Sequence, residues 1–114
     1  MRMNAKTNLL QEQKRLIAEP AFSEPCERCA KRYAAIGDLT AVRICHLIGM
    51  YPGLSPTEVA EILGISVSAA SRALKKLQEA EVATSTKKAQ VVQYRLLDNS
   101  FTRLLKQQLD PLSC

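Results

Sequence analysis

Residues 54–96 read LSPTEVAEILGISVSAASRALKKLQEAEVATSTKKAQVVQYRL, and this stretch decides the fold. It predicts two short helices joined by a tight turn and followed by a hairpin. Ser55, Pro56 and Glu58 form a capping box with a proline at the first helical position. Gly64 supplies the positive φ that ends the first helix, and Ser66 caps the second.

The two helices have apolar faces at helical spacing. In the first helix these residues are Val59, Ile62 and Leu63. In the second, over residues 67–79, they are Val67, Ala70, Leu74 and Leu77. The remaining face of the second helix is polar and basic, which is typical of the recognition helix of a helix-turn-helix. The alternative is an ordinary amphipathic helix with a solvated face.

The segments 81–86 and 91–97 are rich in β-branched residues and flank Lys87-Lys88-Ala89-Gln90. They predict a hairpin with a basic tip, although a solvated lysine-rich loop is the alternative. A basic hairpin directly after a recognition helix favours a winged helix, whose wing contacts phosphates. The predicted fold class is therefore mainly α with a small β-hairpin, a winged helix-turn-helix.

The residues expected to contact DNA follow from this arrangement. Small side chains at the start of the second helix allow close approach of the backbone, and the positive end of the helix dipole favours phosphate there. The residues predicted to contact DNA at this end and through base edges are Ser66, Ser68, Ser71 and Arg72. Those predicted to contact phosphates are Lys75, Lys76, Lys87, Lys88 and Arg95.

The composition sets limits on the class of protein. With 114 residues and 46% hydrophobic content, the chain has enough apolar residues for one small core. A net charge of +5 suits a polyanionic partner without requiring one. The sequence contains neither an apolar run long enough to span a bilayer nor a secretory signal, so we expect a cytoplasmic protein with reduced cysteines.

The flanking segments complete the predicted organisation. Residues 1–22 are expected to form an N-terminal helical extension, and residues 23–114 the winged helix-turn-helix and dimerisation domain. Pro20 and Pro25 are expected to lie in a linker before a fresh helix that ends near Gly37. The last helix carries an apolar stripe, and a domain this small leaves little core surface for that stripe to cover. We expect it to pair, together with the helix that holds Cys29, against a second copy.

Three segments carry a resemblance to a known family. Residues 38–44, DLTAVRI, are similar to the "DPTRLRIL" signature of the ArsR/SmtB repressors. Residues 66–77, SVSAASRALKKL, resemble their "SQSTVSRHLKVL" recognition helix, and residues 89–96 resemble their wing. Leu39, Ala41 and Ala73 depart from the pattern. The resemblance implies a homodimeric repressor, not an enzyme, that binds a near-palindromic DNA operator and is released by a metal ion or thiol chemistry.

The cysteines indicate which inducer to expect. The interfacial zinc site of this family needs histidine on the last helix, but His46 is the only histidine. Its cadmium and arsenite site needs cysteines near residues 54–58, where none occurs. Cys45 and Cys114 resemble the redox pair of the BigR/HlyU-type branch, which implies release by a persulfide or an oxidant, a small thiol-reactive inducer. Arg43 or His46 could lower the pKa of Cys45.

Cys26-Glu27-Arg28-Cys29 leaves alternatives open. Together with Cys45 this CxxC motif could give three thiolates for arsenite, cadmium or zinc, whereas the leading interpretation needs no cofactor. A zinc ribbon would require a second CxxC. A small thiol oxidoreductase using Cys26 and Cys29 would require a strand–helix framework that the sequence does not predict. A protein–protein adaptor with a winged-helix fold is a further alternative.

Overall fold

A computed structural model describes residues 5–110. The chain divides into two compact units, residues 1–31 and residues 32–114. The division that we predict after residue 22 falls inside a helix and remains a prediction. In the described residues, no helix is both long enough and apolar enough to cross a membrane.

The first unit contains helix α1 (Ala5–Ile17) and most of helix α2 (Pro20–Ala35). The predicted linker between Pro20 and Pro25 is wrong, because α2 already begins at Pro20. The Glu19 carbonyl accepts from the N–H groups of Phe22 and Ser23, each at 3.0 Å, so it starts the helix. Pro20 fits the first position because its missing N–H has no helical partner there. Pro25 removes one later hydrogen bond on an exposed stretch, where water can replace it.

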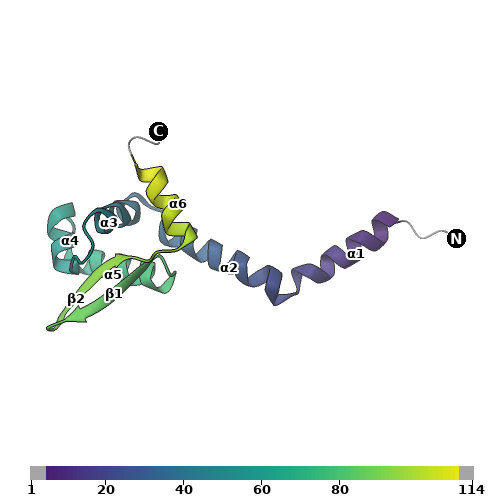
Figure 1. Ribbon diagram of the computed structural model, residues 1–114, viewed down its shortest axis with the longest axis horizontal. Helices are drawn as coiled ribbons and strands as arrows, with labels where there is room; N and C mark the ends of the chain where they lie inside the picture. Colours follow the sequence, from purple (N-terminus) through teal and green to yellow (C-terminus); the bar gives the residue numbers. More distant parts are fainter. Residues whose placement is uncertain (1–4, 111–114) are drawn as a thin grey trace. The chain divides into compact units, whose positions relative to one another are not determined.

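The second unit is built from four further helices and one hairpin (Figure 1). Its elements are α3 (Leu39–Met50), α4 (Pro56–Leu63), α5 (Val67–Glu79), β1 (Ala83–Lys88), β2 (Val91–Leu96) and α6 (Ser100–Leu109). This order confirms the predicted fold class, which is mainly α with a small hairpin directly after the second helix of the helix-turn-helix.

The predicted caps are confirmed at atomic detail. The Glu58 N–H donates to Ser55 Oγ at 3.2 Å, and the Ser55 N–H donates to Glu58 Oε1 at 3.0 Å. Gly64 ends α4 with a φ of 68°. Ser66 Oγ then accepts from the Ala69 N–H at 3.1 Å and begins α5. These contacts fix the angle at which the polypeptide turns from α4 into α5.

The hairpin is antiparallel, with Ala83 opposite Leu96 and Lys88 opposite Val91. Its two-residue turn, Ala89-Gln90, has positive φ at both residues, as a type I′ turn requires. The segment before α4 adds a further pairing, because the Tyr94 N–H donates to the Leu54 carbonyl at 2.8 Å. The hairpin is therefore fixed to the start of the helix-turn-helix.

The core lies between α3, α4, α5 and the base of the hairpin. Its largest fully buried side chains are Ile44, Ile48, Leu74, Leu77, Val59 and Val82. Two predicted core residues are wrong: Ile62 is 55% exposed and Val67 is 49% exposed. Val67 is the first residue of α5 and projects beyond the core, while Ala60 instead of Ile62 completes the inner face of α4.

Candidate nucleic-acid interface

Helix α5 has one buried face and one exposed face. Ala70, Leu74 and Leu77 are fully buried. At 100° per residue, the opposite side of the helix carries Ser68, Arg72, Lys75 and Lys76, all of them exposed. Ser71 lies on the flank of this face and is half-buried. The structure thus brings four predicted DNA contacts together on one cationic face.

The N-terminal end of α5 is open to solvent. Ser66 caps the helix and lies with its Oγ 3.3 Å from Ser68 Oγ. Its hydroxyl is therefore already engaged as an acceptor, and any contact with DNA would use its remaining hydrogen-bonding capacity. Residues 66–68 are exposed, and the helix dipole favours an anion at this end.

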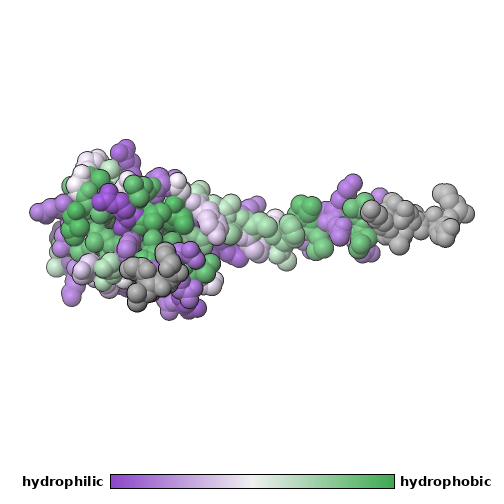
Figure 2. Space-filling view, turned by 90° about the horizontal axis from the view of Figure 1, so that it is seen from above, coloured by the Kyte–Doolittle hydropathy of each residue, from purple (hydrophilic) through white to green (hydrophobic). Residues whose placement is uncertain are grey.

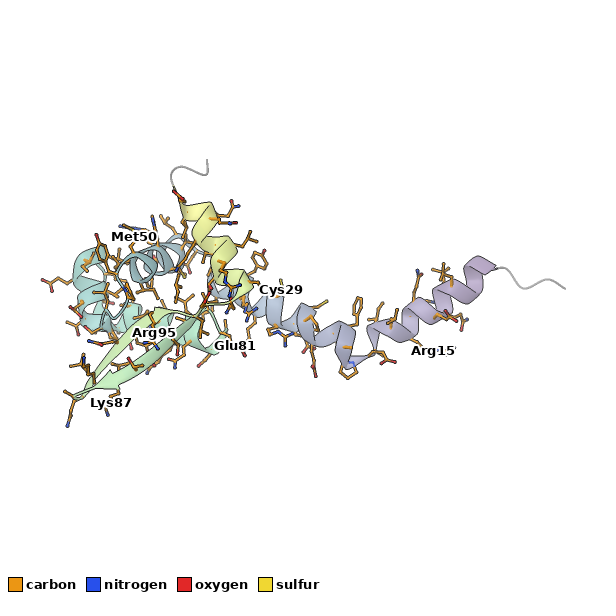
Figure 3. The ribbon with its side chains drawn as sticks, in the orientation of Figure 1. Arg15, Cys29, Met50, Glu81, Lys87 and Arg95 are labelled. Carbon is orange, nitrogen blue, oxygen red and sulfur yellow. The ribbon has the colours of Figure 1, made fainter. Side chains whose placement is uncertain are left out.

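The hairpin carries the second group of cations. Lys87 and Lys88 end β1 next to the turn, and Lys87 lies at the free end of the hairpin (Figure 3). Arg95 is exposed, while its neighbour Tyr94 on the other face of β2 is buried. Gln90 is also exposed in the turn, which makes it a candidate contact that the sequence did not single out.

A set of contacts that the sequence did not reveal holds the C-terminal end of α5. Arg32 Nε donates to the Ala80 carbonyl at 3.3 Å, and Arg32 pairs with Glu81 at 3.4 Å. The Arg32 guanidinium also lies 5.7 Å from the centre of the Phe101 ring. Asn99 Nδ2 donates to the Glu81 carbonyl at 3.0 Å. Since these partners are 18 to 69 residues apart in sequence, no local pattern could have identified them.

Cys45 lies in the core of the second unit and is fully buried. Burial raises its pKa to about 12, so the thiol is protonated at neutral pH. The hypothesis that Arg43 or His46 lowers this pKa is therefore wrong for this conformation: both side chains are exposed, and desolvation decides. Cys114, its predicted partner, lies outside the described residues.

A pocket of about 310 Å³ adjoins Cys45 between α3 and α6. Its lining residues are Cys45, His46, Gly49, Met50, Lys106, Leu109 and Asp110. Met50 marks the α3 side of this region in Figure 3. A Cβ on Gly49 would lie 3.0 Å from Leu96 Cδ1, so a larger residue at this position would require the Leu96 side chain to shift. The pocket places open space directly beside an otherwise inaccessible thiol.

The other two described cysteines are in a different environment. Cys26 and Cys29 are free and exposed on α2. Across residues 5–110, the structure gathers no group of three or more His, Cys, Asp or Glu side chains placed to hold a metal ion. The alternative site of Cys26, Cys29 and Cys45 remains a prediction, because Cys26 and Cys29 lie in the first unit and Cys45 lies in the second.

Comparison with known proteins agrees with this architecture. Residues 38–88 match the profile of the MarR family. The structure is similar to reduced HlyU from Vibrio cholerae, with a TM-score of 0.68 and 22% identity over 84% of this chain and 99% of that one. The chain has a winged helix-turn-helix fold. No curated protein matches the sequence.

Two further solved structures share this winged helix. NolR from Sinorhizobium fredii has a TM-score of 0.69 and 21% identity over 84% of this chain and 95% of its own. The homodimeric DNA-binding domain of a possible ArsR-family regulator from Mycobacterium bovis has a TM-score of 0.70 and 16% identity over 76% of this chain and 80% of its own. At these identities the likeness shows the fold, and the ArsR branch and its dithiol subgroup remain predictions.

Proposed function

We propose that the chain is a DNA-binding transcriptional repressor that acts as a homodimer. The observation that carries this proposal is the cationic outer face of α5 beside the lysine-tipped hairpin, both fixed to one core. Two α5 helices would enter successive major grooves about 34 Å apart. The lysines of the hairpin would contact the phosphate backbone on either side.

The proposed dimer uses apolar surface that one copy leaves open. Tyr33 is 56% exposed and Leu104 is 53% exposed. They line a shallow groove with Ile36, Phe101, Leu105 and Gln108. A two-fold axis would let the same groove on each copy cover the other. The homodimeric state of the similar Mycobacterium bovis domain supports a dimer.

A DNA-binding titration with the protein's own upstream region tests the function. Arg72→Ala should weaken binding to the operator by about 1–3 kcal/mol, as expected for a lost base contact. Arg43→Ala, which removes an exposed arginine from α3, is the matched control and should leave the affinity unchanged. Equal affinities of Arg72→Ala and the parent protein would show that this face does not read DNA.

Release from DNA is proposed to follow the linking of Cys45 and Cys114. Cys114 follows Asp110 by four residues, a reach of at most about 14 Å from a residue that lines the pocket. Because Cys45 is buried and protonated, Cys114 would attack first. An organic persulfide RSSH and the two thiols would yield the protein disulfide, RSH and H₂S. The link would tie α3 to the chain after α6 and change how the two α5 helices are presented.

Mass spectrometry of polysulfide-treated protein tests this mechanism. A cross-linked species should join the peptides of Cys45 and Cys114, with loss of DNA binding. Cys45→Ser and Cys114→Ser should each stay on DNA after treatment. The double variant Cys26→Ser, Cys29→Ser is the control and should respond like the parent protein. If the same reagent released the Cys114→Ser variant from DNA, the proposed link between Cys45 and Cys114 would be refuted.

A further inference from the structure

One face of α2 combines apolar side chains with the CxxC motif. Phe22, Cys26, Cys29 and Tyr33 follow one another at spacings of four, three and four on a single continuous helix. This is the spacing of a seam between paired helices. All four are exposed, and Figure 3 marks Cys29 on this helix. Figure 2 shows hydrophobic residues on the surface of the N-terminal segment as well.

A single copy supplies only half of a thiolate site. Side chains at i and i+3 of a helix have Cβ atoms about 5–6 Å apart, so both sulfurs can reach one ion at about 2.3 Å. Structural zinc requires four such ligands. Within the described part of one chain, no third His, Cys, Asp or Glu joins a metal-binding group with this pair.

We propose that Cys26 and Cys29 from two copies together bind one thiophilic divalent cation of the Zn²⁺ class. This inference rests on the homodimer of the proposed function. A two-fold axis that passes near Cys29 supplies the missing second CxxC and completes a tetrahedral Cys₄ set. The occupant of the seam is a second copy, because Phe22 and Tyr33 continue the apolar spacing on both sides of the motif.

The chemistry of the site balances without an oxidant. Four thiols lose four protons to solvent as four metal–sulfur bonds form, and no electron changes hands. Four thiolates and one divalent ion carry a net charge of −2. Arg28 and Lys31, which neighbour the motif on the same helix, supply opposite charge from each copy. The role of the ion is to join the N-terminal units of the dimer.

Titration of the reduced, metal-free full chain with Cd²⁺, and then with Zn²⁺, tests the site. Thiolate-to-metal absorbance should saturate at about half an ion per chain, as one Cys₄ site per dimer requires. Cys26→Ser and Cys29→Ser should each abolish this saturation point. Cys45→Ala and Cys114→Ser are the controls and should retain it. Saturation at one ion per chain, or absorbance that survives in the Cys26→Ser, Cys29→Ser double variant, would overturn the proposal.

Sedimentation gives an independent readout. If the ion binds only the dimer, the apparent dimer Kd should fall about a hundredfold when free Zn²⁺ is about a hundred times its own Kd. The double variant should show no such change. A dimer that Zn²⁺ does not tighten would contradict the shared site. A gel shift of the metal-free parent protein separates the two proposals: failure there counts against DNA binding, whereas a missing metal effect counts against this site alone.

Discussion

Helices α1 and α5 are both amphipathic and both contain 13 residues, yet α5 has a buried face, whereas residues 9–17 of α1 are all exposed. Leu74 in α5 is fully buried, whereas Leu9 and Leu16 in α1 are 54% and 53% exposed. The difference lies in what the neighbouring sequence supplies. Helix α5 follows a tight turn and precedes a hairpin, so its apolar side meets α3, α4 and β1 at once. An amphipathic pattern predicts a helix and its inner face, but the neighbouring elements determine whether anything covers that face.

The largest expected effect tests this contrast directly. Leu74→Ala should lower the free energy of unfolding by about 2–5 kcal/mol, because it leaves a cavity in the core. Leu16→Ala removes a similar volume from an exposed side chain of α1 and should change stability by less than about 0.5 kcal/mol. Urea denaturation of both variants measures the difference. Equal losses would mean that α1 is packed as firmly as α5.

The next effect concerns α6, which the second unit holds through its cap. Thr102 is buried; its Oγ1 accepts from the Asn99 N–H at 3.0 Å and donates to the Leu97 carbonyl. Thr102→Val keeps the shape but removes these hydrogen bonds, so stability should fall by about 1–3 kcal/mol. Thr86→Val on the exposed end of β1 is the control and should be nearly neutral. If Thr102→Val left the stability unchanged, water would have to bind the Asn99 N–H and the Leu97 carbonyl in place of the threonine hydroxyl.

Within the second unit, the sequence was sufficient wherever the decisive interactions are local. The capping box at Ser55 and Glu58, the glycine stop and the basic tip of the hairpin all depend on residues a few positions apart. The attachment of α5 through Arg32 could not be predicted, because its partners come from distant parts of the chain. The high pKa of Cys45 could not be predicted either, because it follows from burial in the folded core, whereas the sequence showed only the neighbouring Arg43 and His46.

The burial of Cys45 predicts that the stability of the protein falls as the pH becomes alkaline. The pKa of Cys45 is raised from 9.0 to about 12, so the folded state holds the thiol proton more tightly than the unfolded state. The contribution of the protonated thiol to the stability of the folded state is complete below pH 9 and declines as the pH rises from 9 to 12. At pH 10 the loss should be about 1 kcal/mol. Cys45→Ala removes the titrating group, so its stability should fall less between pH 8 and pH 10 than that of the parent protein. Parallel curves would show that the thiol is accessible in the folded state.

The smallest effect lies at the turn of the hairpin, where the sequence and the backbone disagree. Ala89 and Gln90 have φ values of 50° and 74°, a region that residues other than glycine and asparagine rarely adopt. Ala89→Asn with Gln90→Gly would supply the residues that a type I′ turn favours and should raise stability by about 1 kcal/mol. Thermal unfolding measures the gain. Thr86→Gly, at a regular strand position, is the control and should lose stability, because glycine gives up more freedom there. A gain in stability from both variants would indicate that the tip is loosely held and that strain at the turn is not the cause. A gain from the turn variant alone would show that the hairpin adopts this conformation against the local preference of Ala89 and Gln90. The pairing with Leu54 and the core would then be what holds it there.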